Sequence, residues 1–136
     1  MLYRGVRGVL PDSFYVPDVQ GFISAVDYGF TSTSTDAKVP ISFMAPDQLN
    51  VLWVLHCTDG ADSAGQLHNG AVLQPLSQFP AEAETLLPPL CMLQALREGG
   101  AADTTGAFRI EHNKQGENGK GEVVTYTEIH ARPCFV

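Results

Sequence analysis

Residues 50–56 read Asn50-Val51-Leu52-Trp53-Val54-Leu55-His56, a continuous apolar run with a polar residue at each end. A short run of β-branched, aromatic and leucine side chains is typical of a strand that is buried on both faces, because a half-exposed strand would alternate apolar with polar residues. Such a strand needs protein on both sides. The run therefore predicts the centre of a sheet.

The rest of the chain predicts further short extended segments around this strand. Glycine and proline recur at short intervals, which favours strands joined by turns, and helical periodicity is nearly absent. Pro40 and Pro46 limit any helix in 35–48 to about one turn. Residues 113–121 contain three glycines and predict a hairpin with a mobile tip. The expected extended segments are 2–6, 22–26, 29–34, 71–76, 84–87, 90–96, 108–112 and 123–130.

Length and charge limit the classes of protein that fit. The 136 residues are the size of one domain. The net charge is −7 and the eight Lys and Arg residues are scattered, so nucleic acid is a poor partner. Apolar runs fall short of the roughly 20 residues of a membrane span, and no leader pattern is visible. We therefore expect a soluble protein without a membrane partner, and a cytoplasmic location is favoured.

The three cysteines, Cys57, Cys91 and Cys134, are odd in number and have no paired spacing. This pattern predicts free thiols in a reducing compartment. A metal site is not expected, because His56-Cys57 and His68 lack the regular ligand spacing of a zinc centre.

Two acidic residues, Glu82 and Glu84, stand two positions apart, so both side chains of an extended segment project to one face. Carboxylates that share a face repel each other, unless they lie in open solvent or meet a cationic species. One carboxylate can stabilise the positive charge that develops on a sugar as its glycosidic bond breaks. The other can hold a guanidinium group. The alternative is a solvated acidic strand start.

Two further segments carry polar groups on predicted strands. Arg4 interrupts the apolar segment 2–6, and Gly5 after it permits close approach to the backbone. The planar guanidinium suits a diphosphate, although an edge-strand arginine that points to solvent is the alternative. Ser32 and Ser34 share one strand face, where a hydroxyl could orient a neighbouring carboxylate. Here the alternative is a threonine-rich strand stabilised by β-propensity.

Taken together, three motifs in chain order resemble the Arg–Ser–Glu class of mono-ADP-ribosyltransferases. They are Tyr3-Arg4-Gly5, Phe30-Thr31-Ser32-Thr33-Ser34 and Phe79-Pro80-Ala81-Glu82-Ala83-Glu84. The resemblance runs from about Leu2 to Leu96. It implies an α+β, mostly β fold with few or short helices, in which two packed, mainly antiparallel sheets surround an NAD cleft. Residues 1–136 would form a single catalytic domain that transfers ADP-ribose from NAD to an arginine of an acceptor protein and releases nicotinamide.

The resemblance also implies a role for each matching residue of the NAD site. Arg4 would bind the phosphates or ribose of NAD, and Gly5 would offer its backbone to the nicotinamide amide. Ser32 would organise the pocket, and Ser34 would support its strand. Glu84 would be the catalytic carboxylate on the nicotinamide ribose. NAD is then a co-substrate, and no metal is implied.

The resemblance implies that two other residues contact the acceptor protein. Glu82 would address the acceptor, and a glutamate at this position goes with arginine as the modified side chain. Phe79 would lie on the recognition loop against the target surface. Phe43, in the segment after the Ser-Thr-Ser strand, is a candidate to stack on nicotinamide.

Two departures from the class leave other functions open. Relatives usually have a helical region ahead of the Arg-Gly strand, whereas this sequence begins two residues before Tyr3. The region is expected to have been trimmed from the sequence, to come from another chain, or to be absent in a minimal form of the domain. The segment 35–47 is short and proline-broken where relatives often have a helix. The alternatives are an NAD glycohydrolase that uses the same site and a catalytically inactive relative that serves as a binding module.

Overall fold

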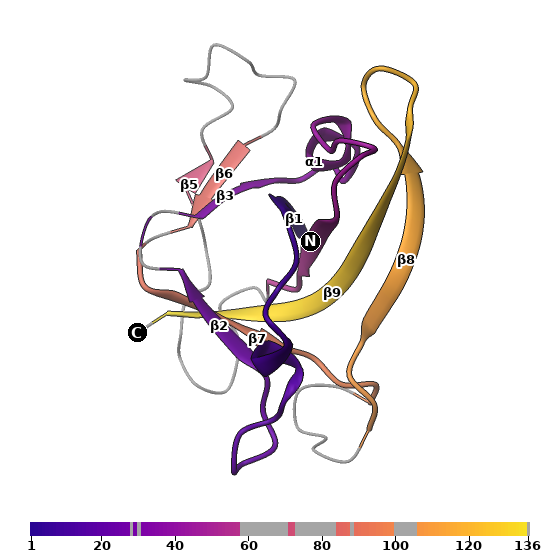
Figure 1. Ribbon diagram of the computed structural model, residues 1–136. Coiled ribbons are helices and arrows are strands. Elements are labelled where there is room, and N and C mark those ends of the chain that lie inside the picture. Colours follow the sequence, from indigo (N-terminus) through magenta and orange to yellow (C-terminus); the bar gives the residue numbers. More distant parts are fainter. Residues whose placement is uncertain are drawn as a thin grey trace.

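The structure, a computed structural model, describes residues 1–27, 29, 31–57, 71–72, 84–87, 89–99 and 106–135. The described chain is a strongly curved sheet with two short helices (Figure 1). The elements in chain order are β1 (Leu2–Arg7), the 3₁₀ helix η1 (Asp12–Tyr15), β2 (Ser24–Asp27), β3 (Thr31–Ser34), α1 (Lys38–Ser42), β4 (Asn50–Leu55), β5 (Ala71–Val72), β6 (Glu84–Leu87), β7 (Cys91–Ala95), β8 (Ile110–Glu117) and β9 (Val123–Phe135).

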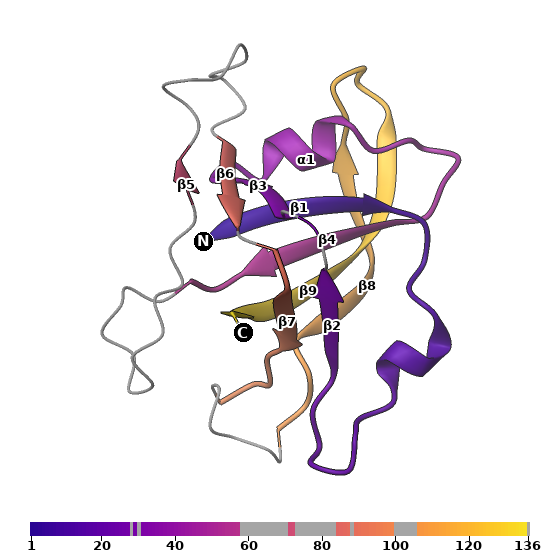
Figure 2. The ribbon, with the colours of Figure 1, turned by 90° about the vertical axis from the view of Figure 1, so that its left-hand side faces the viewer.

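Hydrogen bonds link the described strands in the order β2–β7–β9–β4–β1–β3–β6–β5, and β8 also pairs with β9. β4 and β9 are parallel, whereas the other described pairs are antiparallel. The first part of β9 pairs with β8, and its last residues pair with β7. In Figure 2, β2 and β7 run across the direction of β1 and β4.

The expectation of a mostly β chain with few or short helices is confirmed. The arrangement differs in one detail from two separate packed sheets. β9 is 13 residues long and belongs to both parts of the structure, so the hydrogen bonding continues from one part to the other.

The apolar run at 50–56 is confirmed as a central strand that is buried on both faces, because every residue of β4 is buried. Val51, Trp53 and Leu55 point into the larger hydrophobic core, with residues of β1, β6, β7 and β9. Leu52 and Val54 point to the opposite face, into a smaller core beneath α1. Full burial of one such side chain contributes about 1.5–3 kcal/mol, so β4 stabilises both layers.

α1 confirms the expectation that prolines restrict the 35–48 segment to a short helix. Pro40 is tolerated because it lies in the first turn, where backbone N–H groups have no partner within the helix. α1 packs alongside β1 (Figure 2), and a Cβ atom added at Gly5 would lie 3.1 Å from the Cβ of Pro40. A Cβ atom added at Gly116 of β8 would lie 3.3 Å from Cγ2 of Ile41. The two glycines therefore let the helix approach the sheet.

The hairpin between β8 and β9 differs from the expectation. β8 continues to Glu117 and β9 starts at Val123, so most of 113–121 is strand rather than loop. Asn113 has a φ of 58° beside a register shift between Glu111 and Lys114. The tip contacts the end of α1, because the Gly119 amide donates to the Ser42 carbonyl oxygen at 3.1 Å, and its mobility stays a prediction.

A polar network crosses three neighbouring segments on the face that carries the smaller core. His56 Nε2 lies 2.8 Å from His130 Nδ1, and His130 Nε2 lies 2.7 Å from Glu128 Oε1. Lys114 Nζ donates to Glu128 Oε2 at 2.8 Å and lies 3.4 Å from Glu111. Burial lowers the pKa of His56, and the neighbouring His130 and Arg109 act in the same direction.

The low pKa of His56 predicts a loss of stability in mild acid. The unfolded chain takes up a proton at His56 near its ordinary value of about 6.5, whereas the folded chain does so only at lower pH. The contribution of His56 to the free energy of unfolding is therefore fully present above about pH 6.5. This contribution is lost progressively as the pH falls below that point. Urea unfolding at about pH 7.5 and about pH 5.5 should give a lower midpoint in acid. His56→Gln should make the difference between the two urea midpoints smaller. If that difference is the same in the variant as in the wild type, the explanation is contradicted.

Candidate functional site

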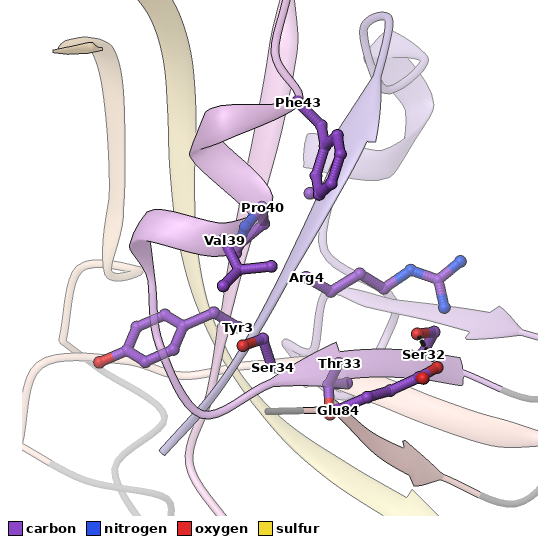
Figure 3. Close-up of a pocket in the computed structure, with 10 residues that line it drawn as sticks. Tyr3, Arg4, Ser32, Thr33, Ser34, Val39, Pro40, Phe43 and Glu84 are labelled. Carbon is purple, nitrogen blue, oxygen red and sulfur yellow. Dashed lines mark hydrogen bonds between the residues drawn. The ribbon is translucent and has the colours of Figure 1, made fainter. Parts of the chain in front are cut away.

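A pocket of about 310 Å³ opens beside the short ladder between β1 and β3 (Figure 3). These two strands share a single register pair, Tyr3 with Ser34. The walls of the pocket come from β1, β3, the first residue of β6, and α1 with the residue that follows it. Three stretches that are distant in sequence, residues 3–5, 32–43 and 84, thus meet at one place.

The β3–β6 ladder brings the predicted hydroxyl and carboxylate together. Ser34 pairs with Glu84, so Ser32, Ser34 and Glu84 project from the same face of this ladder. Ser32 Oγ donates a hydrogen bond to Glu84 Oε1 at 2.7 Å. On the opposite face, the buried Thr33 Oγ1 donates to the Thr85 carbonyl oxygen at 2.6 Å. This second bond joins the same two strands, so the ladder that carries the carboxylate is fixed from both faces.

Arg4 enters the pocket from β1. Its side chain is half-buried, and Figure 3 shows the guanidinium group extending toward the Ser32 hydroxyl and the Glu84 carboxylate. A fixed positive charge and a carboxylate thus line one cavity. Such a cavity suits a ligand that carries an anionic group and develops positive charge nearby.

Apolar groups form the opposite wall. Val39 and Pro40 of α1 line the pocket, and Phe43 stands at its mouth with 60% of its surface exposed (Figure 3). The ring is therefore available to stack on a planar ligand group. Ser34 contributes differently, because its Oγ accepts a hydrogen bond from the Asp36 amide at 3.1 Å and so orders the turn into α1.

The structure gathers six of the predicted site residues in this pocket: Arg4, Gly5, Ser32, Ser34, Phe43 and Glu84. Phe79 and Glu82 lie outside the described residues. Sequence reasoning missed Val39 and Pro40 as lining residues, because nothing in a proline-broken segment shows which strand it packs against. Gly5 within an apolar strand was the one available signal, since it implies a close neighbour.

The described part of the chain holds no group of three or more His, Cys, Asp or Glu side chains arranged to bind a metal ion. None of Cys57, Cys91 and Cys134 is part of a disulfide bond in the structure. Burial raises the pKa of the Cys57 thiol, which lowers its thiolate fraction and its reactivity. Among the described helices, none has the length and apolar character required to cross a bilayer.

Comparisons with known proteins agree with this arrangement at the level of the fold. No protein-family model and no curated protein matches the sequence. The structure is similar to that of the Vis toxin, an ADP-ribosyltransferase from Vibrio splendidus, with a TM-score of 0.52 and 22% identity over 98% of this chain and 47% of that chain. A second similar structure is the ADP-ribosyltransferase HopU1 of Pseudomonas syringae pv. tomato DC3000, with a TM-score of 0.43, 17% identity, and coverage of 94% and 43%.

The chain thus spans about half the length of the solved proteins that it matches. The likeness to the Vis toxin extends over almost the whole of the present chain. The chain therefore has an ADP-ribosyltransferase-like fold.

The close contact between Gly5 and α1 predicts that a side chain at this position disturbs the pocket wall. Gly5→Val should lower the free energy of unfolding by about 1–3 kcal/mol, as overpacking usually does, because its Cβ would lie 3.1 Å from Pro40 Cβ and 3.3 Å from Pro40 O. Urea unfolding measures the change. Gly119→Ala is the matched control, since its nearest contact would be an ordinary 3.4 Å. Equal stability of the two variants would contradict the prediction.

Proposed function

We propose that the chain transfers ADP-ribose from NAD to an arginine side chain of an acceptor protein and releases nicotinamide. One observation carries the proposal: Arg4, Ser32 and Glu84 line one pocket, and Ser32 holds the Glu84 carboxylate by a hydrogen bond. The ADP-ribosyltransferase-like fold supports the same activity. Because the chain spans about half the length of the solved proteins that it resembles, the acceptor and the whole protein's activity are part of the proposal.

The reaction begins when the bond between the ribose C1′ and the nicotinamide nitrogen breaks. The bonding electron pair goes to the ring nitrogen, which neutralises the pyridinium, and the ribose becomes an oxocarbenium-like cation. In our proposal, Glu84 faces this developing charge and stabilises it. The hydrogen bond from Ser32 engages Oε1 and fixes the plane of the carboxylate, so that Oε2 can accept a hydrogen bond from a ribose hydroxyl.

Binding of NAD is assigned to the other residues of the pocket. The Arg4 guanidinium would hold the diphosphate with parallel N–H···O bonds. The Gly5 backbone would meet the nicotinamide amide, and Phe43 would stack on the nicotinamide ring. A volume of about 310 Å³ is at the small end for ligand sites. We therefore place the nicotinamide and its ribose in the pocket, with the adenosine half extending outward.

Transfer is completed when a guanidinium nitrogen of the acceptor bonds to C1′ and loses a proton. Glu82, two residues before Glu84 in the sequence, would hold the guanidinium and take this proton. Phe79, also in the preceding segment, would contact the acceptor surface. Attack by water at the same carbon would instead give NAD hydrolysis with the same pocket residues.

Binding of NAD predicts a thermal shift. At about 100 times its dissociation constant, a ligand stabilises the folded state by roughly 2.7 kcal/mol, which a melting experiment detects easily in a domain of this size. Arg4→Met keeps the apolar stem but removes the charge, so it should reduce the shift strongly. A wild-type protein with no shift in millimolar NAD would instead favour an inactive binding module.

The two glutamates predict separable effects on catalysis. Glu84→Gln should lower transfer and hydrolysis roughly 100-fold or more, by analogy with the loss of other groups that stabilise transition-state charge. Glu82→Gln should lose transfer to arginine but keep hydrolysis. Labelled NAD with an arginine-rich protein separates the products, and mass spectrometry locates the modified residue. Equal losses in the two variants would argue against the division of roles.

A further inference from the structure

The backbone on which Phe43 stands is held by the sheet at three consecutive carbonyl groups. Ser42 O accepts from the Gly119 amide at 3.1 Å, Phe43 O from Arg7 Nη2 at 3.3 Å, and Met44 O from Asn118 Nδ2 at 3.0 Å. Carbonyl groups at the end of a helix have no partner within the helix. Here β1 and the tip of the β8–β9 hairpin supply the donors.

Asn118 is the central residue of this anchor. It is buried, and Nδ2 donates to Glu122 Oε1 at 3.1 Å as well as to Met44 O. Its Oδ1 accepts from the Lys120 and Glu122 amides, both at 2.9 Å. An asparagine amide has two N–H donors and two acceptor lone pairs, so all four are used. One side chain thus closes the hairpin turn and joins it to the segment that follows α1.

The anchored backbone contrasts with the exposed ring. Phe43 is 60% exposed and lines the pocket, while its own amide donates to Pro40 O at 3.3 Å. An exposed aromatic side chain on a free loop would lose conformational entropy on ligand binding. Because the backbone is already fixed, the backbone part of that loss is avoided, which favours affinity.

We propose that Asn118 is a positioning residue that holds Phe43 at the mouth of the pocket through the Met44 carbonyl, and that it thereby sets the affinity for NAD. The inference rests on the proposed function for its ligand. Asn118 lies 74 residues from Met44 in the sequence, and the contact exists because the hairpin tip folds over the end of α1.

Asn118→Asp tests the proposal more cleanly than Asn118→Ala, which would also open the hairpin turn. An aspartate can still accept from the Lys120 and Glu122 amides. Its second oxygen can donate neither to Met44 O nor to Glu122 Oε1, so the variant loses the anchor and also the contact with the Glu122 side chain. Glu122→Ala removes that second contact alone, so the difference between the two variants isolates the loss of the anchor. We expect the KM for NAD to rise about tenfold, which corresponds to about 1.4 kcal/mol, while kcat changes little. Lys120→Ala, an exposed position in the same turn, is the control and should keep the wild-type KM.

A double-mutant cycle separates positioning from a general structural effect. Phe43→Ala should itself raise the KM, and the addition of Asn118→Asp should raise it no further, because Asn118 acts through Phe43. If the two substitutions raise the KM independently, so that the double variant has a higher KM than Phe43→Ala, the proposal is overturned. An unchanged KM in a folded Asn118→Asp variant would also overturn it.

A measurement without NAD separates this inference from the proposed function. Exchange of the Phe43 and Met44 amide protons, followed by NMR, should accelerate in Asn118→Asp and stay unchanged in Lys120→Ala. Faster exchange in Asn118→Asp would support the anchor whether or not the wild-type protein binds NAD. If the wild-type protein does not bind NAD, the proposed function is overturned while the anchor still stands. Unchanged exchange in Asn118→Asp would overturn the anchor.

Discussion

The burial of β4 on both faces is the constraint on which the rest of the structure depends. Val51, Trp53 and Leu55 require the larger core, whereas Leu52 and Val54 require a cover on the other side. The cover is α1 and the residue Met44, yet a helix of five residues has no stability of its own. It persists because it packs closely on the sheet, and its position over β1 creates one wall of the pocket.

The pocket itself combines opposite charges that are brought together by different kinds of contact. Glu84 is fixed by strand pairing and by the Ser32 hydroxyl, while Arg4 reaches the same space from a strand that shares one register pair with β3. Groups that are fixed before a ligand arrives need little rearrangement when charge develops. The arrangement therefore suits a substrate that is anionic at one point and becomes cationic at another.

The sequence was sufficient to predict the central strand and to identify the motif residues that line the pocket. It was less informative for elements that form only beside a neighbouring strand or turn. β4 was predictable because burial on both faces leaves an unbroken apolar run. β8 was not, since its residues 113–117 are mostly polar and exposed, and they form a strand only because β9 lies beside them. Asn118 gave no signal either, because an asparagine before a glycine looks like an ordinary turn residue. The approach of Arg4 to Ser32 and Glu84 came from the family resemblance and not from spacing, and the roles of Phe79 and Glu82 stay predictions.

The parallel pairing of β4 with β9 has a consequence for biosynthesis. β4 leaves the ribosome long before β9, and until then only β1 can share its backbone hydrogen bonds. A nascent chain at that stage would present an unsatisfied apolar edge, which favours association with chaperones or with other chains. The support for Phe43 also comes from this late segment, so a partly synthesised chain would hold an incomplete pocket. The wall of the pocket at Phe43 would gain this support only after translation had passed the hairpin between β8 and β9.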